Sequence, residues 1–472
     1  MTVTTFDFGM IGLGVMGRNL LLNFADNGVA AAGYDTRPEA CAALEANATA
    51  GTMVKGFTNL PAMVAALSSP KLVMLLVPAG QPVDDVLATL SPLLQPGDVI
   101  IDGGNSHFSD TTRRSKMLAP TGIHFVGMGV SGGEEGARRG PAMMPGGDLQ
   151  AWQTLKPLLE RIAAKAYDAP CVAHMGSHAA GHYVKMVHNG IEYAIMQIIT
   201  EIYDVLKRGY GMNNSTQHQL FAEWNTGRLQ SYLVEITADI LATPNPDGMG
   251  YLVDFILDKA GSKGTGKWTS QTAMDLGVPI PNIDIAVSMR QMSAFKTMRV
   301  EAAALFAPTA PPPTADAEMA KTQAEQALYA ATIIAYAQGL HLLQVASKDL
   351  DMQIPMANVV KIWRGGCIIR SLLLNTIYPL FEQKPQLQNM LLEPVIATVV
   401  QQCLPGLKAV VKTGIDSGIA LPALQAALAY VQALSTHTLP INLLQAQRDY
   451  FGAHTFERVD KPGTFHHPWT QD

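Results

Sequence analysis

The sequence is poor in charged residues, and it carries no excess of positive charge. Charged residues make up 15% of the 472 residues and hydrophobic residues 48%, which is typical of folded proteins with large cores and excludes a disordered chain. The formal net charge is -6, with no run of five Lys and Arg, which argues against a nucleic-acid-binding protein. A chain of this length predicts two or three domains.

Closely spaced cysteines and targeting segments are also missing. The four cysteines, Cys41, Cys171, Cys367 and Cys403, form no CxxC pair, so we expect reduced, buried thiols and no metal site. We find no apolar stretch long enough to cross a bilayer and no signal-peptide pattern at the first residues. These features predict a cytoplasmic protein without a membrane partner.

A glycine-rich turn follows the first strand-like run, at residues 6–11. The turn consists of Gly12, Leu13, Gly14, Val15, Met16 and Gly17. A helical pattern and a second strand-like run, residues 29–34, come next, and Asp35 ends that run. This order of strand, glycine turn, helix, strand and acid is the dinucleotide-binding fingerprint, in which amides at a helix start hold the pyrophosphate. A glycine turn without a ligand is the alternative.

Further strand-like runs at residues 72–77, 99–101 and 125–130 alternate with helical stretches. This alternation predicts a doubly wound, mostly parallel sheet in an α/β domain. Two runs end in small polar segments that contain Asn105 and Ser131. Because ligands bind at the carboxyl ends of parallel strands, both residues are candidates for nicotinamide or substrate contacts. Ordinary turn chemistry is the alternative.

From about residue 177 long helical stretches dominate, interrupted at 307–313 by a Pro-rich segment that we expect to be a surface loop. Within them, Lys185, His188, Asn189 and Glu192 follow the spacing i, i+3, i+4 and i+7, so they share one helix face. A Lys–Glu pair on a solvated face is the usual explanation. The neighbouring residues are strongly apolar, however, and a buried ammonium and carboxylate favour a functional role.

Residues 261–269 form a second glycine-rich segment, with Lys263, Thr265 and Lys267. It nearly matches a P-loop, but Trp268 stands where a hydroxyl must meet magnesium, and no buried strand precedes it. We therefore exclude nucleotide hydrolysis. The segment can still hold one phosphate through amides and ammonium groups, and a flexible basic loop is the alternative.

The C-terminal segment combines Arg448, His454 and a run of aromatic residues up to Trp469. A tail of this composition is expected to dock on another surface rather than remain free. We interpret His466 and His467 as surface histidines, because no Cys, Asp or Glu stands at metal-ligand spacing from them.

Six blocks, in order along the chain, closely resemble the 6-phosphogluconate dehydrogenase family. They are residues 12–17, 102–106, 130–138, 185–193, 263–269 and 448–454. The resemblance spans essentially the whole chain. It implies an α/β Rossmann domain (1–177), a large all-α substrate and dimerisation domain (178–434) and a C-terminal tail (435–472) that reaches the partner subunit's active site in a homodimer.

The resemblance also implies the reaction. This is the metal-independent oxidative decarboxylation of 6-phospho-D-gluconate to D-ribulose 5-phosphate and carbon dioxide, in pentose supply or gluconate breakdown, with hydride transfer from C3 to a nicotinamide. The family's general base falls on Lys185, its general acid on Glu192, and His188 and Asn189 join them. The implied substrate contacts are Asn105, Ser131, Gly132, Gly133, Lys185, His188, Asn189, Glu192, Tyr193, Lys263, Thr265 and Arg290, with Arg448 and His454 from the partner.

The cofactor is where the sequence departs from the family pattern. The implied cofactor contacts are the turn from Gly12 to Gly17, Val77, Asn105 and the segment Asp35, Thr36 and Arg37. The family's NADP-dependent members carry Asn-Arg-Thr in that segment and an alanine at the position of Gly14. A carboxylate at Asp35 suits ribose hydroxyls and repels a phosphate, so we expect a preference for NAD. Arg37 could pair with the 2′-phosphate of NADP from a position displaced by one or two residues, so NADP is the alternative cofactor.

Two other functions remain at this stage. A β-hydroxyacid dehydrogenase of the 3-hydroxyisobutyrate type shares the glycine turn, the Ser-Gly-Gly segment and the helix lysine. Those chains are shorter and lack the Lys263 loop and the Arg448–His454 segment. A non-catalytic nucleotide-sensing protein would need to have lost a catalytic residue, but Lys185 and Glu192 are both present.

Overall fold

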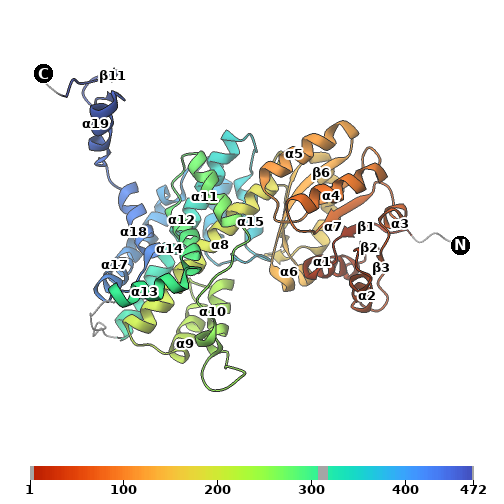
Figure 1. Cartoon of the computed structure of the whole chain (residues 1–472), viewed down its shortest axis with the longest axis horizontal. Coiled ribbons are helices and arrows are strands. Elements are labelled where there is room, and N and C mark those ends of the chain that lie inside the picture. Colours follow the sequence, from red (N-terminus) through yellow and green to blue (C-terminus); the bar gives the residue numbers. More distant parts are fainter. Residues whose placement is uncertain (1–4, 307–316, 470–472) are drawn as a thin grey trace. The chain divides into compact units, whose positions relative to one another are not determined.

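The computed structural model describes residues 5–306 and 317–469 and divides the chain into two compact units, Met1–Ala427 and Leu428–Asp472. The first unit contains a seven-stranded sheet and a large helical region, and the second unit contains the C-terminal helix and hairpin (Figure 1). The predicted Pro-rich surface loop at 307–313 lies outside the described residues.

The sheet has the order β3-β2-β1-β4-β5-β6-β7, and all neighbours except β6 and β7 pair in parallel. The strands are β1 (Phe8–Ile11), β2 (Ala31–Tyr34), β3 (Val54–Phe57), β4 (Leu72–Leu75), β5 (Val99–Asp102), β6 (His124–Ser131) and β7 (Ala142–Gly147). Strands β1, β4 and β5 are buried on both faces, as expected for a parallel sheet covered by helices. The predicted doubly wound, mostly parallel sheet is confirmed.

Helices cover both faces of this sheet. The first seven are α1 (Val15–Asp26), α2 (Pro38–Ala46), α3 (Leu60–Ala65), α4 (Gln81–Leu90), α5 (Phe108–Leu118), α6 (Gly133–Arg139) and α7 (Leu149–Ile162). One apolar core joins the sheet to α1, α2 and α7, and the other joins it to α3, α4 and α5. A small hairpin of β8 (Lys165–Ala166) and β9 (Ala169–Pro170) ends the region.

The helical region begins with α8 (Ala180–Asp204), a 25-residue helix that is buried along most of its length. The helices that follow are α9 (Asn214–Trp224), α10 (Tyr232–Ala242), α11 (Thr265–Asp275), α12 (Pro281–Ser293), α13 (Lys296–Phe306), α14 (Ala317–Asp349), α15 (Met356–Trp363), α16 (Leu374–Gln383), α17 (Pro394–Asp416) and α18 (Pro422–Leu434). The predicted all-helical character of this region is confirmed.

Two of these helices correct the expectation that no apolar stretch is long enough to cross a bilayer. Glu318–Asp349 and Pro394–Asp416 both reach that length and hydropathy. Inside the protein, 78% of the most apolar window of the first and 39% of that of the second are buried. The first therefore has the burial of a core helix. Its apolar residues are not continuous, which is why the sequence shows no single long run.

The C-terminal unit is organised around one carboxylate. It contains α19 (Ile441–Gly452) and a hairpin of β10 (Phe456–Glu457) and β11 (Thr464–Phe465). Asp449 is fully buried and accepts hydrogen bonds from the Thr455 and His467 amides, from His466 Nδ1 and from Trp469 Nε1. Burial alone would raise the pKa of Asp449, but these donors outweigh it and the pKa is lowered. His466 is thus a structural partner of Asp449, which the spacing in the sequence did not reveal.

Candidate active site

The glycine turn between β1 and α1 is shaped by steric demand at two positions. Gly12 has a φ of +95°, and a Cβ there would lie 2.5 Å from the Leu76 carbonyl oxygen. A Cβ on Gly17 would lie 1.9 Å from the carbonyl oxygen of Gly12. Any larger residue at either position would push the helix away from the strand, so these glycines bring the start of α1 to the sheet edge, where its free amides can hold a pyrophosphate.

A cleft of about 720 Å³ opens at the carboxyl ends of the strands. Its walls come from the glycine turn, from the loops after β4 and β5, and from the segment before α11. The predicted site residues that line it are Gly14, Val15, Met16, Gly17, Val77, Asn105 and Lys263. Its size suits a dinucleotide, and so does its place between β1 and β4, where the strand order of the doubly wound sheet reverses.

Arg114, on α5, fixes two of the loops that line this cleft. Its side chain is fully buried and pairs with Asp84 at 2.8 Å and with Asp102 at 3.4 Å. It also donates to the Gly80 carbonyl oxygen and to Ser106 Oγ. A buried guanidinium is tolerated only when it is fully paired, so this network ties the loop after β4 to the loop after β5. No pattern in the sequence indicates this network, because Arg114 lies up to 34 residues from its partners along the chain.

Helix α8 is held unusually close to the edge of the sheet. A Cβ on Gly181 would lie 2.2 Å from the Gly127 carbonyl oxygen and 2.6 Å from the Gly146 amide nitrogen. One turn later, a Cβ on Gly129 would lie 2.3 Å from Lys185 Cβ. Glycines on β6, β7 and α8 therefore let the helix backbone touch the strands, and this contact fixes Lys185 beside the end of β6.

The predicted face of α8 is a connected polar cluster in an otherwise apolar helix. Lys185 Nζ lies 3.4 Å from His188 Nδ1, which lies 3.1 Å from Asn189 Oδ1. His188 Nε2 lies 3.3 Å from Ser131 Oγ, and Asn189 Nδ2 donates to Thr265 Oγ1 at 3.2 Å. With Nδ1 donating to Asn189, Nε2 accepts from the Ser131 hydroxyl, so one neutral tautomer of His188 satisfies Asn189 and Ser131 together.

Burial sets the charges in this cluster. Burial lowers the pKa of Lys185, although Glu192 and Cys367 oppose the shift. Burial also raises the pKa of Glu192, against the influence of Lys185 and Arg290. His188 has a pKa well below its usual value, through burial and the nearby Lys185. A lysine pushed toward its neutral form beside a carboxyl pushed toward its protonated form is a base–acid pair suited to proton transfer.

The first turns of α11 lie against the same helix. A Cβ on Gly190 would lie 2.8 Å from Thr269 Cγ2, and one on Gly266 would lie 2.6 Å from the Tyr193 ring. The Arg290 guanidinium lies 3.4 Å from the centre of that ring and donates to the Gly261 carbonyl oxygen. Lys263 is exposed, and Thr265 is buried. The structure thus brings the predicted phosphate loop to the Lys185 face, with two cationic side chains beside it.

The remaining predicted substrate residues fall into two groups. Gly132 and Gly133 begin α6, and a Cβ on Gly132 would lie 2.7 Å from the Gly366 carbonyl oxygen, so the turn is closely packed. Arg448 and His454 are exposed residues of the C-terminal unit.

Trp268 and His107 also line the cleft, with their rings 5.0 Å apart in an edge arrangement. We did not single out His107 from the sequence, because no motif marks it.

Both carboxylate oxygens of Asp35, at the end of β2, accept hydrogen bonds from other residues of the chain. One carboxylate oxygen accepts from the Arg37 amide and from Arg37 Nε, each at 3.0 Å. The other accepts from the Leu13 amide at 3.0 Å and from the Arg37 guanidinium at 3.1 Å. Burial would raise the pKa of Asp35, but the bonds from Arg37 and Leu13 prevail and the pKa is lowered. Thr36, between the two partners, is exposed.

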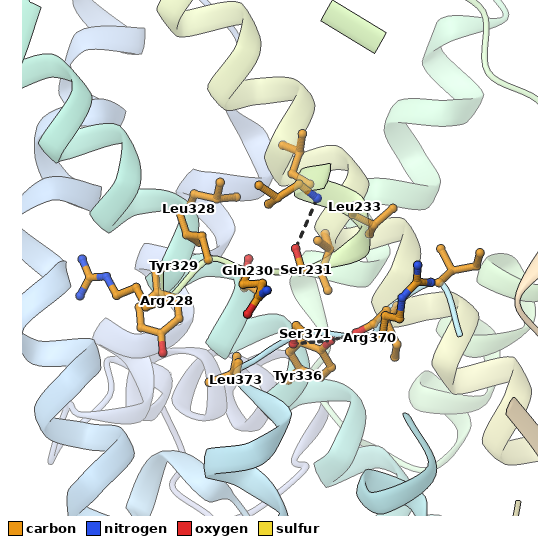
Figure 2. Close-up of a pocket in the computed structure, with 17 residues that line it drawn as sticks. Arg228, Gln230, Ser231, Leu233, Leu328, Tyr329, Tyr336, Arg370, Ser371 and Leu373 are labelled. Carbon is orange, nitrogen blue, oxygen red and sulfur yellow. Dashed lines mark hydrogen bonds between the residues drawn. The ribbon is translucent and has the colours of Figure 1, made fainter. Parts of the chain in front are cut away.

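An apolar cavity in the helical region is not a substrate site. It lies among Ile195, Leu233, Leu328, Tyr336 and Leu373 (Figure 2). Its free space of about 20 Å³ has room for about one water molecule.

Two family models cover the chain. The NAD binding domain of 6-phosphogluconate dehydrogenase matches residues 7–186, and its C-terminal domain matches residues 181–469. A decarboxylating 6-phosphogluconate dehydrogenase of Lactococcus lactis subsp. lactis is 45% identical, with 99% of both chains covered. The NADP(+)-dependent decarboxylating enzyme of Bacillus subtilis is also 45% identical, with 98% of both chains covered.

A solved structure agrees over the same length. The 6-phosphogluconate dehydrogenase of Plasmodium falciparum, studied in its apo form, with its cofactor NADP+ and with its substrate 6-phosphogluconate, matches with a TM-score of 0.95. It is 39% identical, and the match covers 98% of this chain and 100% of the other.

The expected preference for NAD is wrong. The Bacillus subtilis relative is NADP(+)-dependent, and the Plasmodium falciparum enzyme has NADP+ as its cofactor. The structure supplies the physical reason. Arg37 and Leu13 use the oxygens of Asp35 and Arg37 offsets its charge, so Asp35 is not a free acceptor for ribose hydroxyls. A Cβ on Gly14 would meet no protein atom within 4 Å, so packing within the chain does not require glycine there.

The resemblance seen in the sequence is thereby confirmed over the full length of the chain, and the shorter β-hydroxyacid dehydrogenases and the non-catalytic sensor are set aside. The chain belongs to the 6-phosphogluconate dehydrogenase family and is an oxidoreductase of the decarboxylating type.

Proposed function

We propose that this chain oxidises 6-phosphogluconate with NADP and releases carbon dioxide, with Lys185 as general base and Glu192 as general acid. The observation that carries the proposal is the polar face of α8, where burial lowers the pKa of Lys185 and raises that of Glu192. The same face contacts Ser131 and Thr265, which come from the two parts of the chain that enclose the cleft.

In this mechanism a neutral Lys185 takes the proton of the C3 hydroxyl. Bound NADP would supply the acceptor for the hydride that leaves C3. Lys185, now protonated, stabilises the negative charge that develops on the C3 oxygen as carbon dioxide leaves the 3-keto acid. Glu192 then protonates the carbon that has lost carbon dioxide, which becomes C1 of ribulose 5-phosphate. No step needs a metal ion, since the ammonium of Lys185 supplies the positive charge.

The substrate's two charged ends fit different parts of the site. The sugar backbone and carboxylate are assigned to Asn105, Ser131, Gly132, Gly133, His188, Asn189 and Tyr193. The phosphate is assigned to Lys263, Thr265 and Arg290, because amides and cations beside a glycine-rich loop suit a phosphate dianion. Arg290 lies on the Tyr193 ring and donates to the Gly261 carbonyl oxygen and to the Met196 sulfur, so the other N–H groups of its guanidinium remain for a ligand.

For the cofactor, Gly12, Leu13, Gly14, Val15, Met16 and Gly17 are assigned to the pyrophosphate, and Val77 and Asn105 to the nicotinamide side of the cleft. Arg37 is assigned to the 2′-phosphate, with Asp35 as the residue that orients it and Thr36 beside it. An arginine at the end of the second strand is the usual partner of this phosphate. Changing Arg37 to Met should lower kcat/KM for NADP by roughly tenfold or more, as expected for loss of a charged hydrogen bond, and unchanged kcat/KM would contradict the assignment.

The direct test of the catalytic assignment is Lys185→Met. We expect turnover to fall by a factor on the order of 10³ or more, because a positioned base contributes about 10²–10⁴, while 6-phosphogluconate binding weakens far less. Lys348→Met, at an exposed lysine of α14, is the matched control and should leave kcat unchanged. Near-normal turnover by Lys185→Met would refute the role of this lysine.

Arg448 and His454 are assigned to the active site of the partner subunit in a homodimer. Mixing Lys185→Met chains with Arg448→Met chains tests this directly. A heterodimer would contain one site with Lys185 of one chain and Arg448 of the other, so activity should reappear after subunit exchange. No recovery, with heterodimers shown to be present, would mean that Arg448 acts within its own chain or not at all.

We also place the protein in the cytoplasm, in pentose phosphate metabolism or gluconate breakdown.

A further inference from the structure

A polar pocket of about 230 Å³ lies in the first unit, apart from the Lys185 face. Its lining comes from the β8–β9 turn, the segment around the start of α10, the segment after α15 and the start of α16. It shares Gln230, Ser231, Arg370 and Ser371 with the small apolar cavity, and Figure 2 labels these four residues in the lining of that cavity. Nothing in the proposed reaction uses this pocket.

Two arginines face this pocket without a carboxylate partner. Among the described residues, neither Arg364 nor Arg370 has an acidic group within ion-pair distance. Arg364 donates from Nε to the Lys361 carbonyl oxygen, and Arg370 donates from one terminal nitrogen to the Cys367 carbonyl oxygen. Each guanidinium therefore keeps most of its five N–H donors for another acceptor.

Aromatic rings hold both guanidinium groups in place. Arg364 lies over the Tyr167 ring at 5.1 Å and the Tyr378 ring at 4.5 Å, and Arg370 lies over the Tyr232 ring at 3.9 Å. Stacking fixes a guanidinium plane and leaves its edge free, so little side-chain entropy is lost when the edge binds an oxyanion. Arg228, in contrast, stacks on Tyr329 but uses its edge on Glu325 at 2.9 Å.

The other lining groups are mostly polar side chains, among them Asn375 and Tyr167. Asn375 Nδ2 donates to the Tyr167 hydroxyl at 2.5 Å, whereas its Oδ1 is buried without a hydrogen-bond partner. Tyr167, in the strained β8–β9 turn, has a φ of +53°. Glu235 is the one carboxylate of the lining, so the two arginines leave the pocket with a net positive charge. A phosphate offers the planar pair of oxygens that an arginine edge binds bidentately.

We propose that Arg364 and Arg370 form a second oxyanion site, which binds a phosphate group, either free or carried by a small metabolite. The test uses inorganic phosphate as the probe, with binding measured by equilibrium dialysis on the full chain. We expect two classes of site, of which Arg364→Gln/Arg370→Gln removes one and Arg290→Gln weakens the other. Each single substitution in the pocket should weaken the first class about tenfold or more.

The controls separate this site from the proposed active site. Arg208→Gln, at an exposed arginine paired with Asp204, should change neither class, and Glu235→Gln should strengthen binding at the pocket because it removes a repelling charge. Phosphate binding by the double variant equal to that of the wild type would overturn the proposal, provided that circular dichroism shows the variant folded. Unchanged phosphate binding by Arg290→Gln would instead count against the assigned substrate site. The result for the Arg364 and Arg370 pocket would not depend on that outcome. Binding of labelled 6-phosphogluconate to both classes would identify a metabolite source, and binding of free phosphate alone would identify the ion.

Discussion

Replacing Gly129 with alanine should damage catalysis through a contact in which no reacting atom takes part. The added methyl group would lie 2.3 Å from Lys185 Cβ, 2.8 Å from its Cγ and 3.3 Å from the Gly181 carbonyl oxygen. Carbon atoms pack at about 3.5–4.0 Å, so Lys185 or the strand must move by roughly 1 Å. The close backbone contact of Gly181 with Gly127 and Gly146 prevents α8 from moving as a whole.

The expected magnitude follows from this displacement. A shift of about 1 Å in a catalytic group costs on the order of 100-fold in rate, and overpacking a core costs about 1–3 kcal/mol of stability. Steady-state assays of NADPH formation should therefore show kcat reduced about 100-fold, with KM for NADP nearly unchanged because the glycine turn is untouched. The matched control is Gly248→Ala, at a loop glycine where the nearest atom to a new Cβ is 3.8 Å away. A Gly129→Ala enzyme with wild-type kcat would refute the account of how Lys185 is held.

Three further substitutions test other parts of the structure. The negative charge of Glu192 raises the pKa of Lys185. Glu192→Gln removes this charge, so the acid limb of the kcat/KM profile should move to lower pH. An unmoved limb would show that Glu192 does not influence the titration of Lys185. Asp84→Asn should cost about 2 kcal/mol, because it removes the charge of one of the two carboxylates that pair with the buried Arg114. Since the pKa of Asp84 is lowered to about 2 by Arg114, its contribution is present above pH 3.8 and lost as the pH falls toward 2. Acid unfolding curves of the variant should lack this loss. Asp449→Ala should free the C-terminal hairpin, with faster amide exchange at residues 455–467; unchanged exchange would show that the carboxylate is not needed.

The local features of the candidate site could be predicted from the sequence. The glycine turn, the end of β2 at Asp35 and the shared face of Lys185 and Glu192 each depend on residues within a few positions of one another. The strand β7 was not predicted. Its segment Ala142–Gly147 contains a proline and two glycines, and it forms a strand because β6 offers an antiparallel edge there.

Side-chain partners between distant segments could not be predicted. Asp35 was correctly placed, but its charge was interpreted as free because the sequence does not show that Arg37 turns back onto it. The network of Arg114 joins α4, α5 and the β5 loop, and no pattern along the chain marks those residues as neighbours. The pairing of His466 with Asp449 is of the same kind. Each of these depends on the fold rather than on local preference.

The most direct test of the central claim is the stoichiometry of one reaction. The purified chain is given 6-phosphogluconate labelled at C1 and NADP, in the presence of a metal chelator. We predict one labelled carbon dioxide and one NADPH for each substrate consumed, with the rate unaffected by the chelator. NADPH formed without carbon dioxide, or turnover that stops until a metal is restored, would contradict the proposed roles of Lys185 and Glu192.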